Sequence, residues 1–81
     1  MPMSGAARRR LKKIRAKRAK QQKWLCHWCR LPMLPVDATD PELRLTADHV
    51  KPVARGGKTQ WWNIVAAHAL CNNNRSNGKP L

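Results

Sequence analysis

The stretch that decides the fold spans residues 47–77 and reads ADHVKPVARGGKTQWWNIVAAHALCNNNRSN. It begins with an adjacent carboxylate and imidazole, Asp48 and His49, and continues to one amide at Asn63 and another at Asn72. Hard divalent cations prefer carboxylate and amide oxygens as ligands, and an imidazole can take a proton near neutral pH. The stretch is therefore a candidate centre that binds a metal ion and activates a water molecule.

The same part of the chain predicts two strands, a loop and a helix. Residues 43–50 alternate well enough for a strand, and residues 63–67 predict a second strand, antiparallel to the first. Between them, Arg55-Gly56-Gly57-Lys58 predicts a flexible turn with two basic side chains at its tip. From Ala69 the composition favours a helix, which Gly78 and Pro80 end. The predicted order is strand, loop, strand, helix.

The whole chain is short and poor in aromatic residues. Its 81 residues form one small domain at most, with four tryptophans and no Phe or Tyr to fill the core. A core of this size supplies only ~3–5 kcal/mol, so we expect a staple such as a metal ion. No apolar run reaches the ~18 residues of a membrane span, and the basic start lacks the apolar stretch of a secretory signal. We expect a cytoplasmic protein.

The positive charge is concentrated at the amino-terminal end. The formal net charge is +13, and residues 1–23 carry ten Arg or Lys and no acidic residue. Residues 8–23 are rich in strong helix formers and predict a helix with only a weak apolar stripe, whereas residues 1–7 are expected to be disordered. We therefore divide the chain into a basic arm, residues 1–23, and a domain, residues 24–81.

Such an arm is typical of a segment attracted to nucleic acid, and the alternative is a solubilising tail or a localisation signal. The candidate nucleic-acid contacts are the basic side chains of the arm, the turn and the last helix: Arg8, Arg9, Arg10, Lys12, Lys13, Arg15, Lys17, Arg18, Lys20, Arg55, Lys58 and Arg75. Contacts of this kind act through phosphates and weaken steeply with salt.

Two short motifs have the spacing of metal ligands. Cys26-x-x-Cys29 is matched by His68-x-x-Cys71, and two such pairs form a closed tetrahedral zinc site. A redox role for the first pair would need a larger α/β sheet, and the remaining alternative is that Cys71 is simply buried. His27 competes for the fourth ligand position, but His68 fits the two-pair pattern better. Four protein ligands leave no position for water, so this zinc would be structural.

The acidic segment and the paired tryptophans have other expected roles. The acidic residues of segment 37–42 lack ligand spacing and are expected to form a solvated loop. Of Trp61 and Trp62, one is expected to pack beneath the zinc knuckle with Trp24 or Trp28, and the other could stack on a base.

Taken together, the motifs resemble the HNH endonucleases, over about residues 24–77. The features that carry the resemblance are the paired Cys/His knuckles, Asp48-His49 with the following Val-Lys-Pro, Gly56-Gly57, Asn63, and Cys71-Asn72-x-x-Arg75-x-Asn77. The resemblance implies a small α+β protein with the ββα-metal (His-Me finger) fold. A zinc knuckle would staple that fold, and a basic amino-terminal helix or arm would precede it.

The resemblance also implies roles for the matched residues. His49 matches the general base, and Asn63 matches the central asparagine, which braces the loop and orients that histidine. The last motif position falls on Asn72, so this is the Asn-ending variant. Asp48 and Asn72 are then implied as ligands of one catalytic cation, Mg²⁺, Mn²⁺ or Ni²⁺. Because adjacent strand residues point to opposite faces, Asp48 and His49 can act together only if the strand ends or bends there.

The implied activity is a metal-dependent DNA endonuclease or nickase that hydrolyses phosphodiester bonds. With no separate recognition domain expected in so short a chain, nicking or weakly specific cleavage by a monomer is expected. Compact HNH proteins of this kind are similar to those of phages and prophages. By resemblance only, DNA and phage packaging proteins are implied as partners in a bacterial or phage-infected cell. The alternative is a non-catalytic zinc-knuckle DNA-binding protein, which leaves the spacing of the polar residues unexplained.

Overall fold

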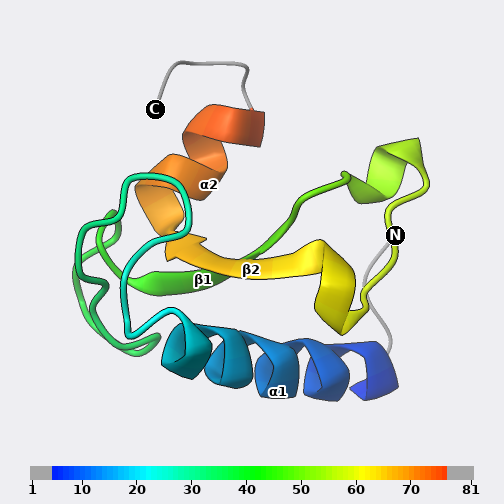
Figure 1. The fold of residues 1–81 in the computed structure, drawn as a ribbon, viewed down its shortest axis with the longest axis horizontal. Coiled ribbons are helices and arrows are strands. Elements are labelled where there is room, and N and C mark those ends of the chain that lie inside the picture. Colours follow the sequence, from blue (N-terminus) through cyan, green and yellow to red (C-terminus); the bar gives the residue numbers. More distant parts are fainter. Residues whose placement is uncertain (1–4, 77–81) are drawn as a thin grey trace.

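The computed structural model describes residues 5–76, in which two helices lie on opposite sides of a two-stranded sheet (Figure 1). The helices and strands are, in chain order, α1 (Gly5–Gln21), β1 (Leu45–His49), β2 (Ile64–His68) and α2 (Ala69–Ser76). Two short 3-10 helices, Val53–Arg55 and Trp61–Asn63, lie in the connection between the strands. The predicted order of strand, loop, strand and helix is confirmed, as is the small α+β class.

The sheet is a single antiparallel pair whose two faces are both covered. Leu45 pairs with His68 and His49 pairs with Ile64, so β2 returns along β1 from the far end of the long loop. In β1 the buried residues are Leu45 and Asp48, which are three positions apart. The predicted alternation therefore does not separate a buried face from an exposed one, because α1 and α2 cover opposite faces.

The basic helix α1 is packed against the sheet. Its buried residue is Ala19, with Leu11 and Ile14 half-buried on the same side. The predicted helix of residues 8–23 is present, but it begins earlier, at Gly5, and ends at Gln21. Disorder was therefore the wrong prediction for residues 5–7, where two alanines, the strongest helix formers, extend the first turn. Residues 1–4 lie outside the described part of the chain.

Two polar side chains, one in α1 and one just after it, bind the backbone of β2. The Arg18 guanidinium donates through Nε to the carbonyl oxygens of Trp61 and Ile64, each at 3.1 Å. The Gln22 amide pairs with both backbone groups of Ala66: Nε2 donates to the carbonyl at 2.9 Å and Oε1 accepts from the N–H at 3.0 Å. Gln22 thereby satisfies backbone groups of β2 that no third strand covers.

The zinc knuckle, residues 26–29, follows a sharp reversal of the chain at the end of α1. Lys23 and Trp24 have left-handed backbone angles, with φ of 56° and 62°, and the Trp24 N–H caps the helix by bonding to the Ala19 carbonyl at 2.8 Å. This turn brings the knuckle alongside β2, where the His27 N–H donates to the Ala66 carbonyl at 3.0 Å. Residues 26 and 29 are thereby placed next to the carboxyl end of β2.

The core is thin, as the composition predicts. Trp28 and Cys29 pack against a buried cluster of small or medium side chains. The cluster consists of Ala19, Cys26, Met33, Leu45, Ala66, Ala67 and Cys71. The largest fully buried side chains among the described residues are only Ile64 and Cys26. Apolar burial on this scale supports the need for a staple.

The tryptophans before β2 do not lie where the sequence predicted. Trp61 and Trp62 are 62% and 61% exposed, so neither packs beneath the knuckle and that prediction is wrong. They lie before the first residue of β2, Ile64, whereas the knuckle meets the other end of the strand. Their rings contact each other edge to face at 6.1 Å between centroids, and the Arg18 guanidinium lies 5.4 Å from the Trp61 centroid.

Candidate metal centre and functional pocket

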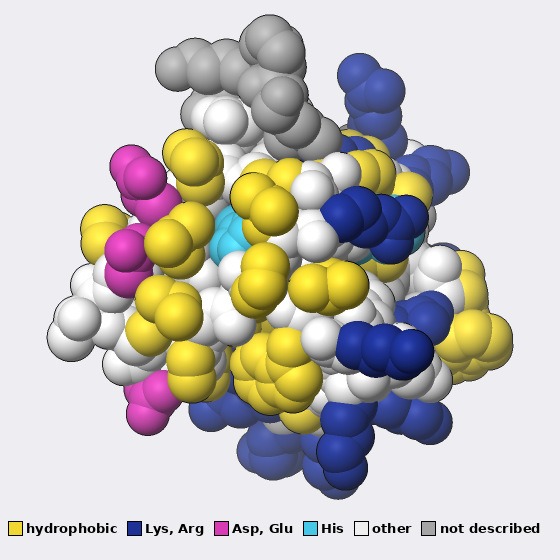
Figure 2. Space-filling view, turned by 60° about the vertical axis from the view of Figure 1, so that its left-hand side comes forward, with side chains coloured by type: hydrophobic (Ala, Val, Ile, Leu, Met, Phe, Trp, Pro, Cys, Tyr) yellow, Lys and Arg dark blue, Asp and Glu magenta, His cyan; other side chains and the backbone are white. Residues whose placement is uncertain are grey.

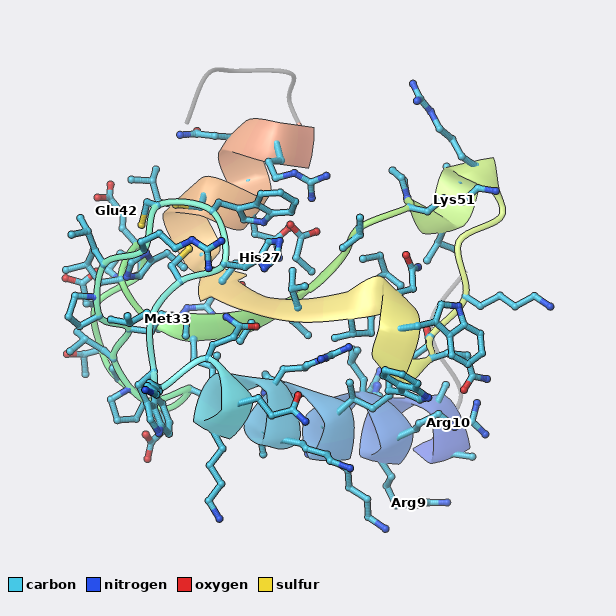
Figure 3. The ribbon with its side chains drawn as sticks, in the orientation of Figure 1. Arg9, Arg10, His27, Met33, Glu42 and Lys51 are labelled. Carbon is cyan, nitrogen blue, oxygen red and sulfur yellow. The ribbon has the colours of Figure 1, made fainter. Side chains whose placement is uncertain are left out.

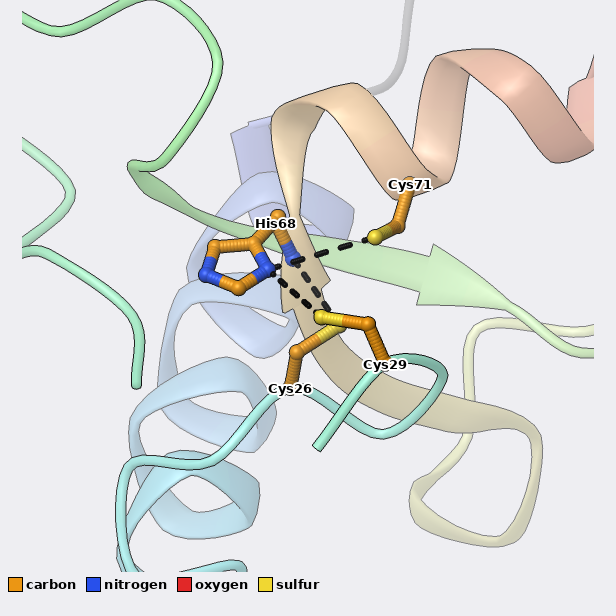
Figure 4. Close-up of side chains that lie close together, drawn as sticks. All are labelled: Cys26, Cys29, His68 and Cys71. Atoms are coloured by element: carbon orange, nitrogen blue, oxygen red, sulfur yellow. Dashed lines mark hydrogen bonds between the residues drawn. The ribbon is translucent and has the colours of Figure 1, made fainter. Parts of the chain in front are cut away.

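The predicted zinc ligands are brought together in the structure (Figure 4). The ligand atoms of Cys26, Cys29, His68 and Cys71 all lie within 4.8 Å of one another. Nδ1 of His68 is 3.2 Å from Sγ of Cys29 and 3.9 Å from Sγ of Cys71. Tetrahedral zinc bonds of ~2.0–2.3 Å place ligand atoms about 3.3–3.8 Å apart. The cluster can therefore hold a zinc ion, as the spacing predicted.

Neighbouring elements orient this cluster. His68 ends β2 and Cys71 lies in the first turn of α2, so the junction between these elements presents both ligands to the knuckle. Nε2 of His68 lies 2.7 Å from the Pro32 carbonyl oxygen, to which it can only donate. That bond fixes the tautomer and leaves Nδ1 as the ligand atom. His27 lies outside the cluster with its ring against Trp28, 4.5 Å between centroids, as expected.

The thiols of the cluster differ in how readily they ionise. Burial opposes ionisation of Cys26, but backbone hydrogen bonds, chiefly from Cys29 and His68, outweigh it and lower its pKa to about 7. Burial raises the pKa of Cys71 to about 12, and the neighbouring Cys29 and Cys26 add to the rise. The negative charges of neighbouring thiolates therefore repel one another, and a bound divalent cation would offset that repulsion.

A pocket of ≈190 Å³ lies between the end of β1 and helix α2. Its lining residues are Ala47, Asp48, His49, Pro52, Asn72 and Arg75. Asp48 and His49 both reach it because β1 ends at His49, which is the condition under which adjacent residues can share one site. The carboxylate, the imidazole and the second amide of the motif are thus gathered at one place.

Asp48 is only 6% exposed, and its carboxylate has two strong donors. Its Oδ2 accepts a hydrogen bond from the Trp28 indole at 2.9 Å and an ion-paired bond from Arg75 Nη1 at 2.6 Å. The Arg75 guanidinium also stacks on Trp28, 3.9 Å from the ring centroid. Both bonds end on the same oxygen, so a cation would bind Asp48 through Oδ1 or by displacing Arg75.

Asn72 is oriented by the strand beneath it. Its amide nitrogen donates to Thr46 Oγ1 at 3.2 Å and to the Ala47 carbonyl at 3.0 Å. Because both amide hydrogens point at β1, the orientation of the side chain is fixed and its oxygen remains an acceptor. Asn72 thus offers the kind of neutral oxygen that hard cations accept.

His49 lies half-buried at the end of β1. Nε2 is 2.9 Å from Thr59 Oγ1, a contact from the loop that no sequence pattern indicated. Burial lowers the pKa of His49, and the nearby Asp48 carboxylate only partly opposes that shift. The neutral imidazole is therefore favoured near neutral pH, which suits a group that accepts a proton.

Asn63 joins the two ends of the loop that carries Thr59. Its Oδ1 accepts from the Lys51 N–H at 2.8 Å, while Nδ2 donates to the carbonyls of Lys51 at 3.0 Å and Lys58 at 2.9 Å. The same loop requires glycine at position 57, where a Cβ would lie 1.7 Å from the Lys51 carbonyl oxygen. Asn63 and Gly57 thereby hold the loop against the end of β1.

Trp28 contacts two pocket residues, Asp48 and Arg75, although the sequence did not connect it with the pocket. It lies between the two cysteines of the knuckle, yet its indole N–H reaches the Asp48 carboxylate. The only available signal was general: a partly buried indole needs an acceptor for its N–H. Trp28 therefore links the metal cluster to the pocket.

The predicted nucleic-acid contacts fall into separate groups. Arg75 lines the pocket, and Arg55 and Lys58 are exposed on the loop. Arg15 and Arg18 are half-buried on the inner side of α1. The exposed cations of α1 are Arg8, Arg9, Arg10, Lys12, Lys13, Lys17 and Lys20. Asn77, the last residue of the matched motif, lies outside the described residues.

The acidic loop has a local structural role. Oδ1 of Asp40 accepts the N–H groups of Glu42 and Leu43, both at 2.8 Å, and these bonds, the one from Leu43 above all, lower the pKa of Asp40. Among residues 5–76, the Cys/His cluster is the one group of His, Cys, Asp or Glu side chains arranged to hold a metal. Asp40 thus fixes the local conformation of the predicted acidic loop.

An antiparallel strand pair followed by a helix, with a Cys₃His cluster at the junction and a polar pocket at the other end of β1, defines a small ββα-metal protein. The sequence profile described as HNH endonuclease matches residues 26–78, which is 53 of the 81 residues. The chain belongs to the HNH endonuclease family. A search of curated proteins found no match. No helix among the described residues is long and apolar enough to cross a membrane.

Proposed function

We propose that the chain is a metal-dependent endonuclease or nickase that hydrolyses phosphodiester bonds in DNA. The observation that carries the proposal is the pocket that gathers Asp48, His49 and Asn72 at the end of β1. A Cys₃His cluster offers four protein ligands and so serves the fold, which leaves the chemistry to the pocket. The resemblance to compact phage proteins extends the proposal to a monomer in the cytoplasm of a bacterial or phage-infected cell.

The pocket fits one hard divalent cation, Mg²⁺, Mn²⁺ or Ni²⁺. Asp48 supplies a carboxylate, and Asn72 supplies an amide oxygen whose orientation the bonds to β1 fix. When bound, such an ion would neutralise charge that develops on the scissile phosphate and favour departure of the 3′ oxygen. A cation that displaced Arg75 from Asp48 would also free the guanidinium to contact a phosphate.

His49 is the proposed general base. In the tautomer that donates from Nε2 to Thr59 Oγ1, Nδ1 is unprotonated and can take a proton from the attacking water. Thr59 in turn is held by the loop that Asn63 braces. Asn63 therefore acts through the loop, as a positioning residue, and does not touch the reacting groups.

Plasmid nicking with Mg²⁺, Mn²⁺ or Ni²⁺ tests the proposal. His49→Ala should lower the cleavage rate by about 10²–10⁴-fold, the range expected for loss of a general base. Asn72→Ala should weaken binding of the activating cation, and Asn73→Ala, an exposed neighbour on α2, is its matched control. Cleavage by His49→Ala at the wild-type rate would show that the proposed base is wrong.

The rival function is DNA binding without catalysis. One contact favours it: the Asp48 carboxylate is engaged by Arg75, as it would be in a purely structural ion pair. In that case no divalent cation would enter the pocket and plasmid DNA would be bound but never cut. If the protein bound plasmid DNA but did not nick it in the presence of Mg²⁺, Mn²⁺ or Ni²⁺, the result would support DNA binding without catalysis.

A further inference from the structure

The cations of α1 lie on the side of the molecule away from the pocket. Residues of β1, α2 and the start of the loop line the pocket, and none comes from α1. Helix α1 packs below the sheet and α2 above it (Figure 1). In the space-filling view, Lys and Arg side chains gather along the lower edge, where α1 runs, and others lie on the right of the view, while the acidic side chains lie on the left (Figure 2).

Four of these cations form a line along the outer face of α1. Arg9, Lys13, Lys17 and Lys20 are spaced by four, four and three residues, which places them on one side of a helix. All four are exposed, and Arg9 points away from the sheet (Figure 3). This group, called the outer stripe below, extends roughly 16 Å at 1.5 Å per residue. Like charges at this spacing weaken a helix, so the stripe does not serve helix stability.

The helix is held in place by side chains on its inner face and just after its end. Arg18 binds the carbonyl oxygens of Trp61 and Ile64, and Gln22 binds both backbone groups of Ala66. Ala19 is fully buried between these contacts. Moving the outer stripe to the pocket side would break all of them, so the stripe stays on its own side of the sheet.

We propose that the outer stripe is a second DNA-binding surface, so that one chain holds two DNA segments at once. The identity of the ligand rests on the proposed function, but the separation of the two surfaces does not. Duplex DNA is stiff over ~150 base pairs and does not fold around a body whose longest extent is 28 Å. A duplex engaged at the pocket therefore leaves the outer stripe to another segment.

A second DNA segment suits the stripe for two reasons. Consecutive cations without an intervening acid match a continuous polyanion, which gains affinity by releasing counterions at each phosphate contact. A long DNA molecule that is held at the pocket also supplies further segments at high local concentration. The partner is thus the substrate itself rather than a separate macromolecule.

A duplex-bridging assay tests the inference with the full chain. A short biotinylated duplex is immobilised, the protein is added in limiting amount without Mg²⁺, Mn²⁺ or Ni²⁺, and retention of a second, fluorescent duplex is measured. Retention should rise in proportion to bound protein. If retention of the fluorescent duplex rose with the square of bound protein, pairs of chains would form the bridge. That result would overturn the inference.

Two variants with equal loss of charge separate the surfaces. The stripe variant carries Arg9→Gln, Lys13→Gln and Lys20→Gln, and the loop variant carries Lys51→Gln, Arg55→Gln and Lys58→Gln. The stripe variant should lose bridging at least about tenfold, since three phosphate contacts contribute roughly 2.7 to the salt slope. Cleavage at saturating DNA should fall less in the stripe variant than in the loop variant, because the start of the loop lines the pocket and α1 does not.

The outcomes distinguish this inference from the proposed function. Stripe-dependent bridging in a protein that never cuts DNA would support the second surface and refute the nuclease. Unchanged bridging in the stripe variant would overturn the second surface. So would a loss of saturated cleavage equal to that of the loop variant, because α1 and the pocket would then serve one duplex.

Discussion

The Cys/His cluster and the pocket are built from adjacent residues but on different principles. His68 and Cys71 face the cluster, while Asn72, the next residue, faces the pocket. The cluster is closed, because its four ligand atoms approach one another and need only a metal ion to complete them. The pocket is open, and its groups are held by contacts with Trp28, Thr59 and β1. The first centre thus depends on local spacing and the second on the tertiary fold.

Loss of the metal from the cluster should have the largest effect, because both centres depend on it. Structural zinc in small domains contributes about 10–16 kcal/mol, against the ~3–5 kcal/mol of a core this small. Chelation, or Cys71→Ser, should therefore abolish cooperative thermal unfolding in circular dichroism. Zn²⁺ added back to the chelated wild type should restore the transition, and Mg²⁺ should not. A chelated chain that still melts cooperatively would contradict a structural role for zinc.

Removal of the pocket carboxylate should leave the cluster intact. Asp48→Asn keeps the shape of the side chain but removes the charge that a divalent cation would bind. We expect cleavage to fall by at least about 10²-fold, with weaker Mn²⁺ binding by calorimetry and unchanged zinc content. Equal Mn²⁺ affinity in the variant and the wild type would mean that Asp48 is not a ligand.

A substitution in the loop should disturb the pocket more weakly. In Gly57→Ala the new methyl group would meet the Lys51 carbonyl oxygen, so the loop that carries Thr59 must shift. We expect a loss of about 1–3 kcal/mol in unfolding free energy, as for other overpacked sites, with a matching fall in cleavage. Gly56→Ala is the control: its backbone has φ of +88°, but its Cβ has no neighbour within 4 Å. Denaturant titration should rank Gly57→Ala as the more damaging change.

The closed centre was predictable because its information is local. Two pairs of ligands at fixed short spacing indicated all four cluster residues. Alternation indicated the first strand, and composition together with Gly78 and Pro80 indicated α2. The fold class was implied by the resemblance to the HNH endonucleases, which the same residues carry. These features depend on residues that are close together in the sequence or on a motif that repeats.

The packing of α1 could not be predicted in the same way. The helix is held by Arg18 on its inner face and by Gln22 just after its end, whose partners are backbone groups more than forty residues away. Such contacts leave no period in the sequence. Trp61 was misplaced for the converse reason, since its apolar ring favoured burial while its position before β2 left it exposed. The sequence pattern therefore did not predict long-range polar contacts or the exposure of side chains next to a strand end.

The smallest predicted effect tests the link between the two centres. Trp28→Phe keeps an aromatic ring against the core and under Arg75 but removes the N–H that holds Asp48 Oδ2. Loss of a bond that orients a metal ligand costs about 10–100-fold in metal affinity, so Mn²⁺ binding and its activation of cleavage should weaken about tenfold. Zinc content should stay at the wild-type value, while the smaller ring against the core and the lost bond should lower the melting temperature modestly.

The control for that link is Trp24→Phe, an exposed tryptophan just before the same knuckle. It should change neither Mn²⁺ affinity nor cleavage. If Trp28→Phe lowered zinc content along with activity, the indole would serve only the knuckle, and the two centres would fail together for a structural reason. If it changed neither measurement, Arg75 alone would suffice to hold the carboxylate. If Trp28 positions Asp48, its substitution should weaken Mn²⁺ binding and cleavage and leave the zinc content unchanged.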